Sequence, residues 1–290
     1  MRTLEALLKK GIVVLEESGI GEARLDAWLL LEYVTGKSRA YYFAHPDDPV
    51  AEEKAETYLE LCRQRGNHIP LQHLTHRAFF MQYEFYVNEH VLIPRQDTEV
   101  LVEEAQKRLC SIQAPQILDM CTGSGCILLS LLAEKKDAFG TGVDISLDAL
   151  QVAERNAKSL ELCDRALFIK SNLFSGYYFQ EKCSKEKAEY DMLISNPPYI
   201  PTAEIEGLME EVKLHDPRIA LDGMEDGLYF YRKITEAAPD YLRSGGWLMY
   251  EIGCEQGPAV SEMMKNAGFT SVTVIQDLAG LDRVVAGQRL

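Results

Sequence analysis

Residues 117–129 decide the fold of this chain, and they read Ile117-Leu118-Asp119-Met120-Cys121-Thr122-Gly123-Ser124-Gly125-Cys126-Ile127-Leu128-Leu129. The first apolar residues predict a buried strand, the glycines predict a tight turn, and the last apolar residues predict a helix. In an open parallel sheet, the crevice at such a strand-to-helix turn binds nucleotide-like ligands. Gly123 and Gly125 let the backbone approach a ligand where a Cβ would collide. We therefore expect a ligand at this turn.

Strand and helix patterns alternate through the rest of this region. The strand candidates are residues 116–120, 140–144, 167–171, 192–195 and 247–252. Strands separated by helices imply a mostly parallel sheet with helices on both faces. The last two candidates, 271–276 and 283–286, are close in sequence with a glycine between them, which predicts an antiparallel pair at the sheet edge. We therefore expect an α/β fold with a seven-stranded, mostly parallel, Rossmann-like sheet.

The N-terminal part of the chain has a different pattern. Apolar residues recur at intervals of three and four within residues 4–15 and 25–33, which predicts a small helical bundle. Aromatic and β-branched residues dominate residues 79–94, which predicts a short β-hairpin. We expect three parts: a helical domain at 1–72, a β-hairpin linker at 73–96 and a ligand-binding domain at 97–290.

Composition restricts the possible partners. The formal net charge of -15 argues against a surface built to neutralise nucleic-acid phosphates. No apolar run approaches the roughly 20 residues of a membrane span, and the first residues lack the layout of a signal peptide. We therefore expect a cytoplasmic protein without membrane contact. Cys121 and Cys126 have no second Cys or His pair at zinc spacing, so we expect no metal.

The tetrapeptide Asn196-Pro197-Pro198-Tyr199 follows an apolar run that predicts a buried strand. Its prolines fix φ and force the residue before each of them to be extended, so the Asn196 side chain and the Pro197 carbonyl become two rigid acceptors. Such acceptors suit the two hydrogens of a planar NH2 group, and the Tyr199 ring can lie against its π-system. An ordinary strand-end turn is the alternative, because Asn and Pro are common in turns.

An acidic residue strengthens the ligand prediction. Asp144 ends the second strand candidate, roughly 20 residues after the glycines, where an acidic side chain can bind ribose hydroxyls. NAD and ATP are weaker guesses, because neither a full GxGxxG run nor a Gly-Lys-Ser/Thr run is present. The run LDxxTGSG, Asp144 and the Asn-Pro-Pro-Tyr run together resemble class I S-adenosylmethionine-dependent methyltransferases. The alternative is a glycine-rich turn that packs without a ligand.

The resemblance extends to one family of these enzymes. The segment Leu92-Ile93-Pro94-Arg95-Gln96-Asp97-Thr98-Glu99 is similar to the "LIPRxxTE" segment of the bacterial release-factor glutamine methyltransferases, the HemK/PrmC family. Residues 70–74, 216–223, 226–228 and 246–253 also resemble family segments, so the similarity covers essentially the whole chain. It implies a methyltransferase sheet, a helical N-terminal domain for substrate recognition and S-adenosylmethionine as the cofactor.

The resemblance implies roles for the residues of this chain that occupy the positions of the family's site residues. The family implies that the methionine part of the cofactor contacts Cys121, Thr122, Gly123, Ser124 and Gly125. Its ribose would contact Asp144, its adenine would lie beside Asn172 and Leu173, and Asn196 would also touch the cofactor. The substrate glutamine would be held by Asn196, Pro197, Pro198 and Tyr199, with Asn196, Pro197 and Tyr199 catalytic. The chain departs from the family's common pattern at Cys121, where many members have Gly, at Asn172, where Asp is usual, and at His215-Asp216-Pro217, where a Glu often precedes the Pro. The change at Asn172 alters the expected contact with adenine, because an amide can donate as well as accept.

The implied activity is methylation of the side-chain amide nitrogen of the glutamine in the Gly-Gly-Gln motif of peptide-chain release factors. Enzymes that methylate the amino group of adenine or cytosine share the Asn-Pro-Pro-Tyr run and form the main alternative. The acidity and the lack of a basic, aromatic-rich recognition segment argue against direct nucleic-acid binding. A non-catalytic S-adenosylmethionine-binding module is a further alternative, against which Asn196, Pro197 and Tyr199 argue.

The sequence is compatible with more than one role for each of three charged residues. Arg95 could reach the substrate, close over the cofactor or form a structural ion pair. Glu99 is placed to favour the N-terminus of the helix expected after Thr98. Glu251 ends the strand candidate 247–252, where sheets carry ligands, and it could also pair with a buried partner.

Overall fold

The computed structural model describes residues 2–182 and 189–290. Its contacts divide the chain into two units. The helical unit comprises residues 1–77 and 209–215, and the sheet unit comprises residues 78–208 and 216–290. The predicted boundaries at 72 and 96 therefore differ from these divisions, and the segment 209–215 joins the helical unit although it lies far along the chain.

Amphipathic helices build the helical unit, as their periodicity predicts. They are α1 (Leu4–Glu17), α2 (Ala23–Thr35), α3 (Arg39–Ala44), α4 (Glu52–Gly66), α5 (Leu71–Thr75) and α10 (Glu210–His215). Apolar side chains of α1 to α5 form a core around Leu30, Leu31 and Tyr58, and a second cluster contains Leu15, Ile20, Ala23 and Ala27. The hydroxyl groups of Thr3 and Ser38 accept hydrogen bonds from backbone N–H groups at the starts of α1 and α3. The predicted helical bundle is confirmed.

The sheet unit contains a seven-stranded sheet in the order β5-β4-β3-β6-β7-β9-β8. Its strands are β3 (Gln116–Met120), β4 (Phe139–Asp144), β5 (Ala166–Lys170), β6 (Tyr190–Ser195), β7 (Leu242–Glu251), β8 (Thr270–Gln276) and β9 (Asp282–Gln288). The strands β3 to β7 pair in parallel, whereas β9 is antiparallel to both of its neighbours. The predicted α/β fold is confirmed, and β9 lies inside the sheet, so that β8 forms the edge.

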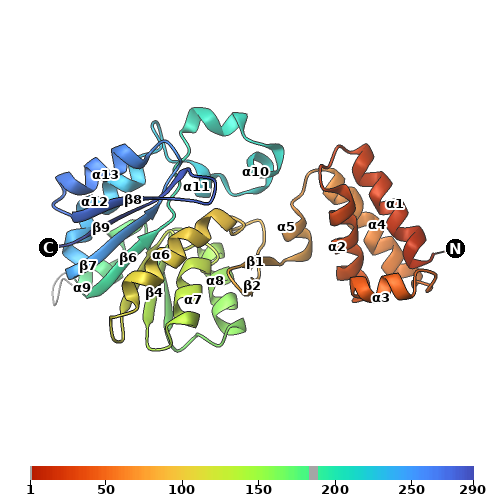
Figure 1. Cartoon of the computed structure of the whole chain (residues 1–290), viewed down its shortest axis with the longest axis horizontal. Coiled ribbons are helices and arrows are strands. Elements are labelled where there is room, and N and C mark those ends of the chain that lie inside the picture. The colour runs from red at the N-terminus through yellow and green to blue at the C-terminus, as the bar shows by residue number, and fades with distance from the viewer. Residues whose placement is uncertain (1, 183–188) are drawn as a thin grey trace. The chain divides into compact units, whose positions relative to one another are not determined.

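Alternating side chains of the strands supply two cores, one on each face of the sheet. On β3, for example, Ile117 belongs to the core with α6 (Glu99–Leu109) and α7 (Cys126–Glu134), and Leu118 belongs to the opposite core with α12 (Tyr229–Tyr241) and α13 (Gly257–Asn266). Figure 1 shows the strands between these helices. The remaining helical elements of the unit are α8 (Leu147–Ser159), α9 (Tyr177–Lys182), α11 (Arg218–Leu221), η1 (Gln96–Thr98), η2 (Leu173–Ser175) and η3 (Thr202–Gly207).

The predicted hairpin is present but short. It consists of β1 (Ala78–Phe80) and β2 (Tyr83–Phe85), which pair in antiparallel fashion. The Met81 N–H in its turn donates to the Glu99 Oε1 atom at 2.5 Å. Glu99 lies in the first turn of α6, where its charge favours the helix N-terminus as expected, and it also joins the hairpin to the start of α6.

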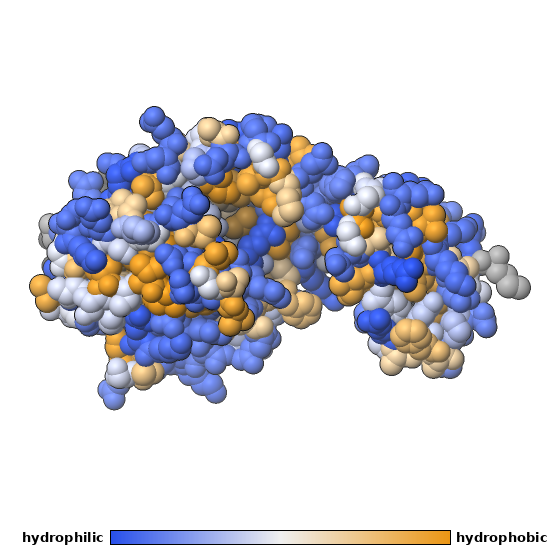
Figure 2. Space-filling view, turned by 45° about the horizontal axis from the view of Figure 1, so that its top comes forward, coloured by the Kyte–Doolittle hydropathy of each residue, from blue (hydrophilic) through white to orange (hydrophobic). Residues whose placement is uncertain are grey.

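Hydrophilic side chains cover much of the visible surface of each unit (Figure 2). Within the described ranges, no helix has the length and apolar content needed to cross a membrane. Those ranges also hold no cluster of His, Cys, Asp and Glu suited to a metal ion. Cys183 lies outside the described residues, and Cys62, Cys110, Cys121, Cys126, Cys163 and Cys254 are free.

A buried ion pair between Arg65 and Asp26 contributes to the helical unit, and its contribution can be measured by substitution. The Arg65 Nε atom lies 2.6 Å from Asp26 Oδ2, and the Arg65 Nη2 atom lies 2.7 Å from Glu211 Oε1. The side chains of Arg65 and Asp26 are 8% and 9% exposed, so neither charge has water to replace a lost partner. Arg65 thus also joins α10 to the helices of the N-terminal region.

We predict that Arg65→Ala lowers the free energy of unfolding of the helical unit by about 3–5 kcal/mol, because it leaves the Asp26 carboxylate buried without its partner. Chemical denaturation followed by circular dichroism measures the loss. Arg63→Ala on the same helix is the matched control, because the Arg63 side chain is exposed, and we expect a change within about 0.5 kcal/mol. Equal effects of the two substitutions would contradict the prediction.

Candidate active site

Parallel pairing brings three strand ends to one edge of the sheet. Met120, the last residue of β3, pairs with Val143 of β4 and with Ser195 of β6. The loops that follow these three strands therefore start side by side at the same edge of the sheet. The chain continues from β3 toward β4 and β5 on one side and returns to β6 on the other, so β3 and β6 flank the topological switch point where α/β sheets bind ligands.

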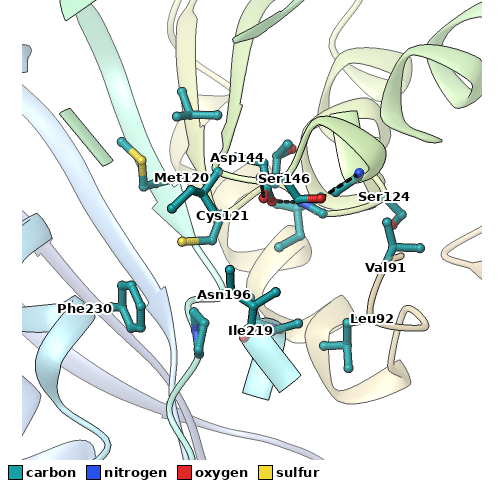
Figure 3. Close-up of a pocket in the computed structure, with 18 of the residues that line it drawn as sticks. Val91, Leu92, Met120, Cys121, Ser124, Asp144, Ser146, Asn196, Ile219 and Phe230 are labelled. Atoms are coloured by element: carbon teal, nitrogen blue, oxygen red, sulfur yellow. Dashed lines mark hydrogen bonds between the residues drawn. The ribbon is translucent and has the colours of Figure 1, made fainter. Parts of the chain in front are cut away.

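A cavity of about 260 Å³ lies at this edge, and all the residues that line it belong to the sheet unit. Figure 3 shows Cys121, Asp144 and Asn196 around it, with Val91, Leu92, Ile219 and Phe230 supplying apolar walls. The predicted site residues that line it are Cys121, Thr122, Gly123, Ser124, Asp144, Asn172, Leu173, Asn196 and Pro198. Gly125, Pro197 and Tyr199 are not among its lining residues.

The loop after β3 has three residues in the left-handed region, and only Cys121, which is not a glycine, is strained there. Cys121, Gly123 and Gly125 have φ angles of 63°, 54° and 78°, which favour glycine. A Cβ on Gly123 would meet no atom within 4 Å, so the space beside this residue is open to a ligand. A Cβ on Gly125 would lie 3.2 Å from the Cβ of Ala153 on α8. At Gly125 the absence of a Cβ therefore also permits a close approach between the loop and α8.

Asp144 connects β4 to this loop. Its Oδ2 atom accepts a hydrogen bond from the Gly123 N–H at 2.9 Å, and its Oδ1 atom accepts one from the Ser146 N–H at 2.9 Å. Burial raises the pKa of the Asp144 carboxyl, and the two N–H groups partly offset this effect. A carboxylate has about four lone-pair positions. Asp144 therefore keeps acceptor capacity for the hydroxyl groups of a ribose.

Asp119 was not among the predicted site residues, although it lies directly below the loop. Its side chain is fully buried, and its Oδ2 atom accepts a hydrogen bond from the Thr122 hydroxyl at 2.6 Å. Burial, with a smaller contribution from the Asp144 charge, raises the pKa of Asp119 to about 7. An acidic residue within an otherwise apolar strand was the sequence signal for such a role.

Asn156 is a second residue that the sequence analysis missed. This buried amide on α8 donates to the Ser124 carbonyl at 2.9 Å and to the Tyr86 carbonyl at 3.0 Å. Its oxygen accepts from the Tyr86 N–H at 2.7 Å. Asn156 therefore joins the loop after β3 to the segment after the hairpin. A polar residue on the buried face of an amphipathic helix was the only signal.

The Asn-Pro-Pro-Tyr loop is held by a later segment of the chain. The Ile200 N–H donates to the Leu221 carbonyl at 3.0 Å, and the Gly223 N–H donates to the Ile200 carbonyl at 2.8 Å. A Cβ on Gly223 would lie 2.8 Å from the Tyr199 backbone, so only glycine fits there. Residues 216–223 thus pack on the Asn-Pro-Pro-Tyr loop, and Ile219 from this segment lines the cavity.

Arg95 has both a site position and a structural partner. It lines the cavity, and its Nη2 atom lies 2.6 Å from Asp216 Oδ2. The Asp216 side chain is 0% exposed. The ion pair therefore anchors the start of the segment that covers the Asn-Pro-Pro-Tyr loop, in agreement with the structural alternative for Arg95.

Tyr199 is half-buried and is not among the residues that line the cavity. Its carbonyl accepts a hydrogen bond from the Gln256 Nε2 atom at 3.0 Å. Burial, and then the nearby Glu251 charge, raise the pKa of the Tyr199 hydroxyl to about 12. Its ring packs against the core below the sheet edge.

Known proteins are similar to this chain over nearly its whole length. Residues 6–75 match the PrmC N-terminal domain, and residues 95–213 match the methyltransferase small domain. The release factor glutamine methyltransferase of Geobacter sulfurreducens is 40% identical over 274 residues, which cover 94% of this chain and 92% of that protein. The release factor glutamine methyltransferase of Clostridium acetobutylicum is 37% identical over 289 residues, which cover 100% and 99% of the two chains.

A solved structure is also similar to this chain. It is the release-factor-specific protein-(glutamine-N5) methyltransferase of Alicyclobacillus acidocaldarius, with 30% identity, a TM-score of 0.44 and coverage of 71% of this chain and 99% of that chain.

We predict that Asp144→Ala weakens the binding of S-adenosylmethionine about 10- to 100-fold, the range expected for the loss of a hydrogen bond to a charged group. The substitution removes a carboxylate that lines the cavity and releases the Gly123 N–H. Isothermal titration calorimetry measures the affinity. Asp148→Ala, an exposed residue of α8, is the control, and the prediction fails if the two variants bind the cofactor equally well.

The raised pKa of Asp119 predicts a pH-dependent stability of the ligand-free protein. Between about pH 4 and 7 the folded chain keeps a proton on Asp119 that the unfolded chain releases. The contribution of this group to stability therefore falls as the pH rises through that window, by at most about 1.4 kcal/mol per pH unit.

Asp119→Asn should remove this slope, because the amide is uncharged and its oxygen can still accept from the Thr122 hydroxyl. We expect the variant to gain stability relative to the unmodified protein as the pH rises from about 4 to 7. Urea denaturation across this range measures the difference. Asp164→Asn, a change at an exposed carboxylate, should leave the slope unchanged, and parallel curves for Asp119→Asn would contradict the assignment.

Proposed function

This chain belongs to the family of release factor glutamine methyltransferases, and we propose from that premise that it methylates the side-chain amide nitrogen of the glutamine in the Gly-Gly-Gln motif of peptide-chain release factors. It is an S-adenosylmethionine-dependent methyltransferase. The observation that carries the proposal is the presence of Asn196 in the same cavity as the loop after β3 and Asp144. A group that accepts N–H bonds thus lies beside the residues assigned to the cofactor.

The cofactor assignment fits the residues present. The open space beside Gly123 and the remaining acceptor capacity of Asp144 suit a ligand with a flexible polar end and a ribose. Apolar walls from Val91, Leu92 and Phe230 suit the flat faces of an aromatic base. When bound, S-adenosylmethionine supplies an electrophilic methyl group on a sulfonium. We assign Cys121 to Ser124 to its methionine end, Asp144 to its ribose, and Asn172 with Leu173 to its adenine.

The main task of the protein is to orient a poor nucleophile. The lone pair of an amide nitrogen is delocalised into its carbonyl, so attack requires an in-line approach and stabilisation of the charge that develops on nitrogen. We propose that the Asn196 Oδ1 atom and the Pro197 carbonyl accept the two N–H bonds of the glutamine amide. Both acceptors are preorganised, because the prolines fix the backbone and residues 221–223 hold the loop.

No strong general base is required in this mechanism. The nitrogen becomes acidic only as the new N–C bond forms, and its proton can then leave to water. Pro198 forms part of the cavity wall. We also propose that the Tyr199 ring stacks on the amide plane of the substrate glutamine. Tyr199 does not line the cavity, so this stacking requires the substrate to reach a ring outside the set of lining residues.

We assign substrate recognition beyond the glutamine to the helical unit, whose residues 6–75 match the PrmC N-terminal domain. The proposed protein substrate also agrees with the net charge of -15, which does not favour a nucleic-acid surface. Since release factors act in translation, we place the activity in the cytoplasm.

The test is transfer of a labelled methyl group. The protein is incubated with methyl-labelled S-adenosylmethionine and either a release factor, the same factor with its Gly-Gly-Gln glutamine changed to alanine, or DNA. We expect label only on the unmodified factor and only on that glutamine after peptide mapping. Label on DNA would support amino methylation of a nucleobase instead. Cofactor binding without label on any acceptor would support a non-catalytic module.

We predict that Asn196→Ala lowers kcat by about 100- to 1,000-fold, as for the loss of a donor or acceptor that stabilises a transition-state charge. Cofactor affinity should change much less, because the loop after β3 and Asp144 are unaltered. Initial rates and calorimetric affinity separate the two effects. The exposed Asn266→Ala change at the end of α13 is the control, and near-normal turnover of Asn196→Ala would refute this mechanism.

A further inference from the structure

We propose that Glu251 is a positioning residue: its buried carboxylate holds the side-chain amide of Asn196 with the NH2 group inward, so that the Asn196 oxygen faces the cavity. This inference rests on the proposed function, because it concerns the orientation of the acceptor that would bind the glutamine amide. An asparagine can perform that task in only one of its two amide orientations.

The sheet places the two side chains next to each other. Ser195 of β6 pairs in parallel with Tyr250 of β7, so the next residues along the two strands are Asn196 and Glu251. Glu251 is 2% exposed, whereas Asn196 lines the cavity. The carboxylate therefore lies behind Asn196, on the side away from the substrate.

The groups behind Asn196 favour one amide orientation. The Asn196 Nδ2 atom donates to the Thr98 Oγ1 atom over 3.4 Å, a long hydrogen bond. Burial raises the pKa of the Glu251 carboxyl, whereas the Thr98 hydroxyl, the Arg283 charge and the Asn196 amide each lower it. An ionised carboxylate only accepts hydrogen bonds. If the amide were reversed, its oxygen would face the Glu251 carboxylate, which has no proton to donate, and the Thr98 hydroxyl, whose proton is directed to Glu251.

The charge of Glu251 is not explained by a structural ion pair. Arg283 is the nearby cation, and within the described parts of the chain its ion pairs are with Asp97 at 3.3 Å and Asp277 at 3.0 Å. The Glu251 Oε2 atom is buried, and no hydrogen-bond partner is found for it among the described residues. A buried carboxylate with an unsatisfied oxygen is destabilising, so stability alone is a poor reason for a glutamate at this position.

The burial of Glu251 makes the orientation sensitive to pH. Burial raises the pKa of the carboxyl to about 7. Above this pH the carboxylate accepts from the Asn196 NH2 group. Below it, the protonated acid can donate to the Asn196 oxygen and release the amide from its productive orientation. Titratable or charged groups on several elements interact electrostatically with Glu251. They are Asp97 before α6, Cys126 of α7, Tyr199 of the Asn-Pro-Pro-Tyr loop, Tyr231 of α12 and Arg283 of β9.

Three variants of the full-length protein test the inference. Glu251→Gln removes the charge at nearly constant volume and supplies a donor. Glu251→Asp keeps a carboxylate. Glu255→Gln makes the same chemical change as the first variant at an exposed residue four positions later and is the matched control. For each protein, kcat with a release factor, the affinity for S-adenosylmethionine and the pH dependence of kcat from about pH 5.5 to 8.5 are measured.

We expect Glu251→Gln to lower kcat at least about tenfold, to leave cofactor affinity within about threefold, and to abolish the fall of kcat below about pH 7. Glu255→Gln should match the unmodified protein. Glu251→Asp should retain the acidic fall in kcat even if its maximum is lower. Unchanged kcat in Glu251→Gln, or an acidic fall that persists in it, would overturn the inference. If Glu251→Gln does not fold, the unmodified protein and Glu251→Asp decide the matter. The inference would be overturned if kcat did not fall at acidic pH in either protein.

A second measurement reads the orientation without turnover. The side-chain amide signals of Asn196 in ¹⁵N-labelled protein, assigned by their loss in Asn196→Asp, should shift with an apparent pKa near 7 in the unmodified protein and in Glu255→Gln, but not in Glu251→Gln. An unmodified protein that does not methylate a release factor would refute the proposed function. The amide signals would still decide the role of Glu251, and a shift that is unaffected by Glu251→Gln would refute it.

Discussion

The parallel register of β3, β4 and β6 is the constraint on which the site depends. Because Met120 pairs with both Val143 and Ser195, the three strands end at one level and release their following residues into one crevice. The loop after β3, Asp144 and the Asn-Pro-Pro-Tyr loop meet there although they are far apart along the chain. A shift of one residue in any of these strands would also exchange the two faces of the strand between the opposite cores. The hydrophobic alternation that stabilises the sheet therefore also fixes the geometry of the site.

Buried carboxyl groups form a second common feature of this edge. Asp119, Asp144 and Glu251 all have pKa values raised chiefly by burial, and each is held by N–H or O–H donors from the loops that surround the cavity. These acceptors organise the loop after β3 and the Asn-Pro-Pro-Tyr loop from behind. In this arrangement, polar groups under the cavity set the directions in which the exposed groups point, as preorganised catalysis requires.

Several segments that resemble the family but lie outside the predicted site pack against the residues that line the cavity. Residues 216–223 pack on the Asn-Pro-Pro-Tyr loop through backbone hydrogen bonds and through the close approach of Gly223 to Tyr199. Arg95, in the segment that precedes α6, anchors the same region through Asp216. Glu99, in the first turn of α6, also supports the hairpin turn. These segments contribute to the site by holding the residues that line it.

The sequence alone determined the features that local physics controls. Alternating apolar residues predicted the strands, glycines predicted the turn after β3, and the two prolines predicted a rigid loop after β6, since each signal depends on neighbours along the chain. The resemblance then indicated the cofactor and the chemistry. Only the tertiary structure decided that β9 lies inside the sheet, that Gly125 packs on α8, and that Asn156 and Glu251 stand behind the site. These features depend on contacts between residues distant in sequence, and no local pattern encodes which buried polar group will meet which loop.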